Sequence, residues 1–225
     1  MNPKLVIFDL DGTLLDTIDD LGAAVNHAMQ LRGFPQHTRD EYMRMVGHGA
    51  HNLMRRALPD GHKDDETVEA AYNDFRAYYT DHIDMHTQPF PGMQELLATL
   101  HQHGMLLAVA SNKFQEGTEH LIKEFFPNIP FVAILGNRHN FPLKPSPEIV
   151  EEVLRKAGVT REEAVMVGDS ETDMETAANG GIDAIAVGWG YRDMKDLAKK
   201  WSALRQAQGP RVADSAEELL KTLHS

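Results

Sequence analysis

The segment Leu5–Phe8 is a run of four apolar residues that is followed at once by Asp9 and Asp11. A continuous apolar run of this kind predicts a strand buried on both faces, as in a parallel sheet. The two carboxylates after it cannot belong to the core, because burying an unpaired charge costs too much free energy. Ligands of open parallel sheets bind at the carboxyl ends of the strands. The segment therefore predicts a metal-linked carboxylate site at that edge, with a solvated Asp-rich turn as the alternative interpretation.

The overall composition narrows the classes of protein and of partner. The chain has 225 residues, of which 42% are hydrophobic, so it can bury the core of one large domain or of two small ones. Its formal net charge of −12 argues against nucleic acid or an anionic membrane as a partner. It contains no cysteine, and no basic leader precedes the first apolar run. No apolar run approaches the roughly 20 residues that span a bilayer, so we expect a soluble, cytoplasmic protein.

A helical insert interrupts an alternating pattern of strands and helices. Between residues 16 and 85 the apolar residues repeat at helical spacing, and no stretch predicts a strand. The buried strands expected later in the chain are 106–110, 131–135, 164–167 and 184–187, followed by a helix rich in Lys and Ala and a short strand at 212–213. This alternation predicts a three-layer, Rossmann-like α/β fold with a parallel sheet. We expect residues 1–15 and 88–225 to form a discontinuous α/β core, and residues 16–87 to form a small helical domain inserted after the first strand.

Polar residues follow several of these predicted strands. Ser111 and Asn112 follow the second strand, and Asp169 follows the fourth, with Asp173 one helical turn later. Lys144 lies in a loop before a helix. Each alone is commonly a helix cap or a surface residue. Their shared place at the carboxyl edge of one sheet favours a single ligand site.

These residue types suit one kind of chemistry. Several carboxylates, with no cysteine and no clustered histidine, favour a hard cation, for which Mg²⁺ is the leading candidate. A carboxylate can attack phosphorus and form an aspartyl-phosphate, while a second one moves the proton. A lysine with hydroxyl or amide donors can stabilise the phosphoryl oxygens during transfer.

Four motifs resemble those of the haloacid dehalogenase superfamily. The segment Asp9-Leu10-Asp11-Gly12-Thr13-Leu14 resembles the first motif, and Ser111-Asn112 resembles the second. Lys144 in Lys-Pro-Ser-Pro looks like the third, and Gly168-Asp169-Ser170-x-x-Asp173 is similar to the fourth. They occur in family order, and the resemblance covers essentially the whole chain.

The resemblance implies a role for each motif residue. Asp9 would be the nucleophile and Asp11 the general acid/base. The remaining implied roles are phosphate binding by Ser111, Asn112 and Lys144 (which is also catalytic), Mg²⁺ ligation by Asp9, the Asp11 backbone carbonyl and Asp169, and support of the metal shell by Asp173.

The helical insert lies where this superfamily carries a small cap that closes over the site. Within it, Met45–Leu53 looks like the cap loop of phosphoglycolate phosphatases, and Gly188–Tyr191 resembles another of their segments. Candidate substrate contacts in the cap are Gly47, His48, Gly49 and Arg55, with Arg56 as an alternative to Arg55. An ordinary turn after a helix end is the other interpretation of this loop.

The predicted function is Mg²⁺-dependent hydrolysis of a small phosphomonoester, with 2-phosphoglycolate as the favoured substrate. Asp11 argues against a dehalogenase, and the lack of a histidine soon after Asp16-Thr17 argues against a sugar-phosphate mutase. A pyrophosphatase, a broad-range sugar-phosphate phosphatase, a mutase and a non-catalytic binding or regulatory protein with a relict site stay as alternatives. The expected partner is a small phosphorylated metabolite, and the chain is expected to be a monomer or a homodimer.

Overall fold

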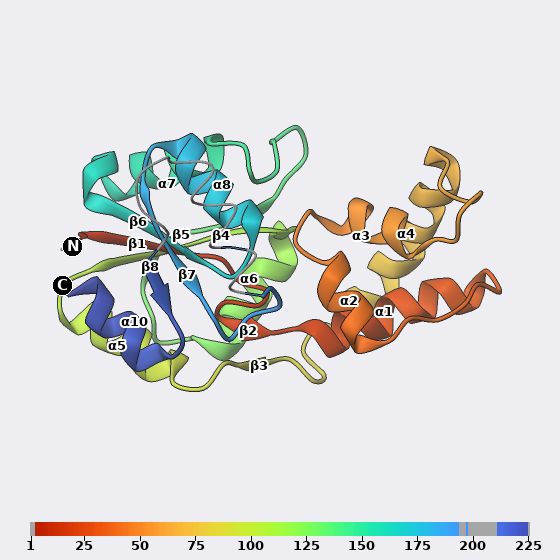
Figure 1. Ribbon diagram of the computed structural model, residues 1–225, viewed down its shortest axis with the longest axis horizontal. Helices are drawn as coiled ribbons and strands as arrows, with labels where there is room; N and C mark the ends of the chain where they lie inside the picture. Colours follow the sequence, from red (N-terminus) through yellow and green to blue (C-terminus); the bar gives the residue numbers. More distant parts are fainter. Residues whose placement is uncertain (1–2, 194–196, 198–210, 225) are drawn as a thin grey trace.

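The computed structural model describes residues 3–193, 197 and 211–224, and its centre is a six-stranded parallel sheet (Figure 1). The strands lie in the order β5-β4-β1-β6-β7-β8. Their bounds are β1 (Leu5–Phe8), β4 (Leu106–Phe114), β5 (Phe131–Asn137), β6 (Ala164–Gly168), β7 (Asp183–Val187) and β8 (Arg211–Ala213). Strand β1 is central, since its Leu5 pairs with Leu106 on one side and Ala164 on the other. All four residues of β1 are buried, which the apolar run predicts.

Helices cover both faces of the sheet, as alternate residues of β1 show. Val6 and Phe8 belong to a core with α5 (Met93–Gln102), α6 (Gln115–Phe125) and α10 (Ala216–Leu223). Leu5 and Ile7 face the opposite core, which includes residues of α7 (Glu148–Ala157) and α8 (Glu171–Gly180). The expected three-layer α/β fold is therefore confirmed.

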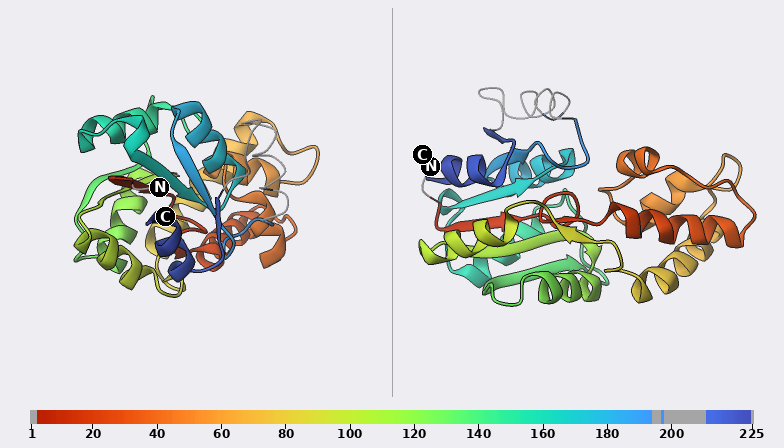
Figure 2. Two further views of the ribbon diagram at one scale, coloured as in Figure 1. Left: turned by 60° about the vertical axis from the view of Figure 1, so that its left-hand side comes forward. Right: turned by 90° about the horizontal axis from the view of Figure 1, so that it is seen from below.

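Four helices lie beyond the carboxyl end of the sheet (Figures 1 and 2). They are α1 (Ile18–Leu31), α2 (Arg39–Met45), α3 (Ala50–Ala57) and α4 (Asp65–Asp81). Where the chain leaves and re-enters the core, β2 (Leu15–Asp16) pairs antiparallel with β3 (Gln88–Pro89). Such a two-residue ladder was not predicted, because two residues carry no periodicity. The helical nature of the insert agrees with the sequence, while its treatment as a domain of its own stays a prediction.

Two strands run further than their apolar patterns predict. Strand β4 continues past Ala110 to Phe114, after a shift of register with β5 between these residues. The side chains of Ser111 and Asn112 therefore project from an irregular strand end and not from a loop. Strand β5 likewise continues to Asn137. The predicted helix rich in Lys and Ala falls mostly outside the described residues.

None of the helices in the described part of the chain is both long and apolar enough to cross a bilayer.

Candidate active site

Asp9 lies at the carboxyl end of the central strand, where its side chain is 11% exposed. Its backbone N–H donates to the carbonyl of Val167 at 2.9 Å, so the neighbouring strand fixes its direction. The ammonium of Lys144 lies 2.8 Å from Asp9 Oδ1 and 2.7 Å from Asp173 Oδ1. Because the Lys144 side chain is also buried, its charge is matched by these two carboxylates.

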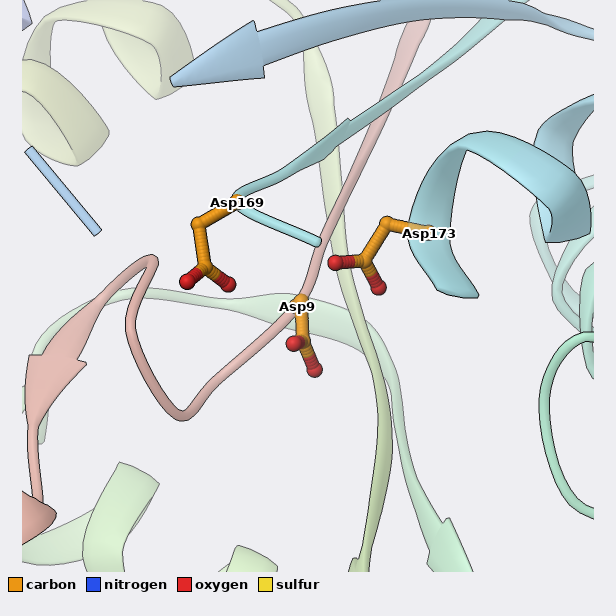
Figure 3. A group of neighbouring side chains, drawn as sticks. All are labelled: Asp9, Asp169 and Asp173. Atoms are coloured by element: carbon orange, nitrogen blue, oxygen red, sulfur yellow. The ribbon is translucent and has the colours of Figure 1, made fainter. Parts of the chain in front are cut away.

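Asp169 and Asp173 complete an acidic cluster with Asp9. One carboxylate oxygen of each of the three lies within 4.8 Å of the others, and Figure 3 shows them converging from the ends of β1 and β6 and the first turn of α8. Helix α8 begins with a capping box, in which Ser170 Oγ accepts from the Asp173 N–H and Asp173 Oδ2 accepts from the Ser170 N–H at 3.0 Å. Both Asp173 oxygens therefore have protein partners, which suits a residue that orients Lys144.

Burial and mutual repulsion dominate the electrostatics of this cluster. Burial, followed by the nearby charge of Asp173, raises the pKa of Asp9 from 3.8 to about 7. Burial also raises the pKa of Asp169 well above its usual range, and Asp173 and Asp9 add to the effect. Burial alone would lower the pKa of Lys144, but the attraction of Asp173 and Asp9 outweighs it and raises that pKa. The cluster thus holds more negative charge than Lys144 compensates.

A divalent cation fits these donors. The cluster offers carboxylate oxygens, which hard cations prefer, and a cation would relieve the repulsion between Asp9 and Asp169. The main chain also passes unusually close: a Cβ added to Gly12, whose φ is +86°, would lie 2.5 Å from Asp169 Oδ2. Only glycine leaves this space free. The cluster can therefore hold a metal ion.

Ser111 and Asn112 line the same cavity as Lys144, and Asn112 also has structural contacts. Its Oδ1 accepts from the Lys144 N–H at 2.8 Å, and its Nδ2 donates to the carbonyls of Lys144 at 3.1 Å and Gly47 at 3.3 Å. Ser111 Oγ accepts from the Lys113 N–H at 3.2 Å. Both residues line the same cavity as Asp9. Asn112 thus joins the β4 end, the Lys144 segment and the loop after α2.

Asp11 has two partners that sequence reasoning missed. Lys113, with 2% of its side chain exposed, places its Nζ 2.9 Å from Asp11 Oδ1 and donates to the hydroxyl of Tyr79 on α4 at 2.8 Å. Thr17 Oγ1 donates to Asp11 Oδ1 at 2.7 Å. The signal for Lys113 was its place directly after Ser111-Asn112. Tyr79 could not be singled out, because it lies on the buried face of α4 with Val68, Tyr72 and Phe75.

The cap candidates divide into two groups. Gly47 and Gly49 line the cavity. His48 lies between them, its Nδ1 is buried without a protein partner, and burial together with the nearby Arg56 and Arg192 lowers its pKa. Arg55 does not line this cavity: it donates to the Lys63 carbonyl and to Asp65 Oδ1, both at 2.6 Å. Its place in the last turn of α3 turns its side chain toward the next loop, so the structure does not support it as a substrate contact.

The parallel sheet with a carboxylate and lysine site at its carboxyl edge defines a protein of the three-layer α/β class whose ligand site lies at the strand ends. Residues 6–187 match the model of the haloacid dehalogenase-like hydrolase family. The chain belongs to this family, which the four sequence motifs predicted.

Within this family, the chain is similar to several proteins named phosphoglycolate phosphatase. The chain is 35% identical to a phosphoglycolate phosphatase of Mesorhizobium japonicum over 98% of each protein, and 34% identical to one of Aliivibrio fischeri over 98% of this chain and 96% of that protein. A crystal structure of a provisionally assigned phosphoglycolate phosphatase from Lactobacillus delbrueckii subsp. bulgaricus superposes with a TM-score of 0.90, at 33% identity and over 99% of both chains. The expectation of a phosphoric monoester hydrolase is confirmed at this level.

Proposed function

We propose that this protein is a Mg²⁺-dependent phosphatase that hydrolyses a small phosphomonoester through an aspartyl-phosphate on Asp9. The observation that carries the proposal is the position of Asp9, at the end of the central strand, with Lys144 Nζ 2.8 Å away and Asp169 in the same cluster. In the proposed mechanism, the nucleophile, a buried cation and a metal-binding group would therefore act at one point.

The residues divide the reaction into two steps. A carboxylate oxygen of Asp9 attacks phosphorus, the bond from phosphorus to the ester oxygen breaks, and Asp11 gives its proton to the departing alkoxide. Asp11 then takes a proton from water, whose oxygen attacks the phosphoryl group and releases phosphate and free Asp9. Lys144, with Ser111 and Asn112, balances the charge on the phosphoryl oxygens.

Asp9, the backbone carbonyl of Asp11 and Asp169 would hold Mg²⁺. When bound, this ion supplies positive charge that lets a chain of formal net charge −12 accept an anionic substrate. Asp173, whose oxygens already bind Lys144 and Ser170, supports this arrangement.

The favoured substrate is 2-phosphoglycolate. Two observations support this choice: the relatives are named phosphoglycolate phosphatases, and the cavity wall has a suitable chemistry. The helical insert, residues 16–87, which we propose acts as a cap domain, contributes mainly apolar residues to this wall, among them Leu21, Leu53 and Phe75. Lys113 adds a cation there, which suits a short acid better than a sugar with many hydroxyls.

A panel of phosphate compounds tests this substrate. With Mg²⁺ present, we expect kcat/KM for 2-phosphoglycolate to exceed that for a hexose phosphate or pyrophosphate by about tenfold or more, since one hydrogen bond to a charged group changes an affinity by about that factor. Phosphate release is the measurement. A higher kcat/KM for a hexose phosphate or for pyrophosphate would replace this substrate while leaving the phosphatase chemistry intact.

Metal binding should depend on pH in a defined direction. Asp9 ionises near pH 3.8 when unfolded, but its pKa is about 7 in the folded protein without a cation. Between these values the folded state holds the extra proton, so the free energy of unfolding of the metal-free protein falls as pH rises. Mg²⁺ binds the ionised carboxylates. We therefore expect the increase in the Tm of the protein on adding Mg²⁺ to be larger at about pH 7.5 than at about pH 5.

The control for this measurement is Asp169→Asn, which removes one proposed ligand and should abolish most of the increase in Tm. An equal increase at both pH values, or an undiminished one in the variant, would place the Mg²⁺ site elsewhere.

A further inference from the structure

The loop after α2 and the segment after β7, both singled out in the sequence, lie against each other, and Arg192 joins them. The Arg192 guanidinium donates to the carbonyls of Met43 and Val46 at the end of α2. Its Nε lies 3.3 Å from Glu171 Oε2 at the start of α8. With only 14% of its side chain exposed, Arg192 is a largely desolvated bridge between helical insert and core.

The carbonyls that Arg192 binds have reasons to need a donor. The last carbonyls of an α-helix lack partners within the helix, and positive charge is favourable there. Helix α2 ends at Met45, and Val46 then turns to an extended conformation with ψ 163°. An arginine from the core thus caps a helix of the insert, which ties the end of α2 to the sheet.

The next residues, Val46 to Gly49, are one of the parts of the insert that line the cavity of Asp9, and we call them loop 46–49. Val46, Gly47 and Gly49 line the cavity. Gly47 and Gly49 have φ of +111° and +81°, a region that other residues rarely adopt. The core contacts of this loop beyond Arg192 include Asn112 Nδ2 to the Gly47 carbonyl, at 3.3 Å.

The segment that carries Arg192 is itself anchored to the acidic cluster. The N–H of Tyr191 donates to Asp169 Oδ2 at 2.7 Å, and the indole of Trp189 donates to the Thr13 carbonyl at 3.0 Å. Arg192 therefore connects Val46 of loop 46–49 to the segment that hydrogen-bonds Asp169.

We propose that Arg192 is a positioning residue that holds loop 46–49 over the catalytic carboxylates and so determines the affinity for the substrate more than the rate of the chemical step. The residues assigned to phosphoryl transfer lie on the core side, and the groups that Arg192 binds, on Met43, Val46 and Glu171, are not among them. The loop, in contrast, lines the space left for the organic part of the substrate. The kinetic part of this inference rests on the proposed phosphatase function.

The test compares Arg192→Gln with a matched control, Arg161→Gln. Arg161 also joins a backbone carbonyl to a carboxylate, with Nε donating to Gly180 at 2.9 Å and Nη2 3.2 Å from Glu151, but it does not line the cavity. For Arg192→Gln we expect KM to rise about tenfold and kcat to change less than about threefold, because charged hydrogen bonds to the loop are lost. Arg192→Lys keeps the positive charge but loses the planar guanidinium that binds two carbonyls at once. Its KM should therefore lie between those of the wild type and Arg192→Gln.

A second measurement does not need turnover. Hydrogen exchange of the backbone amides of residues 43–53 should become about tenfold faster in Arg192→Gln, and stay at the wild-type rate in Arg161→Gln, since loop opening would no longer break the Arg192 bridge. Unchanged exchange would overturn the proposal whatever the substrate is. A fall in kcat at constant KM would also overturn it, by assigning Arg192 to the chemical step. If the wild type hydrolysed no ester of the panel, the proposed phosphatase function would be wrong. The hydrogen-exchange data would still show whether Arg192 holds loop 46–49 in place.

Discussion

Asp9→Asn is expected to lower kcat for Mg²⁺-dependent phosphate release by about 10⁴-fold or more, the scale seen when a nucleophile is removed. The amide cannot form the phosphoryl intermediate, although its shape is nearly that of the carboxylate. Because the Asp9 carboxyl is buried and its pKa is raised to about 7, loss of its charge should not destabilise the fold. Phosphate release and the thermal unfolding temperature, measured on the same preparation, separate these two expectations.

Asp60→Asn is the matched control. Asp60 is also an aspartate paired with a lysine, with Lys63 Nζ at 2.8 Å, but its side chain is 98% exposed. It should keep the wild-type kcat. Phosphate release by Asp9→Asn at a rate close to that of the wild type would rule out Asp9 as the nucleophile.

Lys144→Met is the second variant with a large expected effect. Removing the ammonium leaves Asp9 and Asp173 buried without the cation that lies 2.8 and 2.7 Å from them. Breaking a buried pair in this way costs roughly 3–5 kcal/mol in the free energy of unfolding. The same change removes positive charge beside the phosphoryl group, so kcat should fall by about 10²–10³-fold. Urea unfolding without metal and steady-state kinetics with Mg²⁺ provide the two measurements.

A double variant tests the cause of the instability. Lys144→Met with Asp173→Asn removes one of the two unpaired carboxylates, so it should regain part of the stability and none of the activity. The surface control is Lys221→Met, whose ion pair with Glu217 at 2.7 Å is exposed on both sides and should leave unfolding and kcat unchanged. If Lys144→Met unfolded at the same urea concentration as the wild type, Lys144 would not be the counterion of the cluster.

The positions of the polar residues at the carboxyl ends of the strands could be predicted from the sequence, because they depend on local patterns. A strand buried on both faces has the apolar pattern of Leu5–Phe8, and a polar residue after such a strand lies at the carboxyl edge of a parallel sheet whatever the rest of the chain does. Asp9, Asp11, Ser111, Asn112 and Asp169 were located in this way. The close approach of the main chain to Asp169, which requires glycine at position 12, could not be predicted from the local sequence.

Partners that are remote in the sequence followed from tertiary structure alone. The contacts of Lys113 with Asp11 and Tyr79, of Lys144 with Asp173, and of Arg192 with Met43 link segments separated by 29 to 149 residues. No periodicity reports which side chains meet across such distances, since that depends on how remote segments of the chain pack against one another. The same reason explains Arg55, which seemed a substrate contact by its nearness to the glycine loop but faces Asp65.

The sequence by itself determined the class of fold, the order of its elements and the residues at the carboxyl edge, because strand burial and helix periodicity are properties of short segments. Tertiary structure decided which of those residues are paired, which carboxylates repel one another, and how loop 46–49 is held over Asp9. These depend on distances across the fold, where burial strengthens every charge interaction and a single buried lysine or arginine can control several carboxylates or carbonyls.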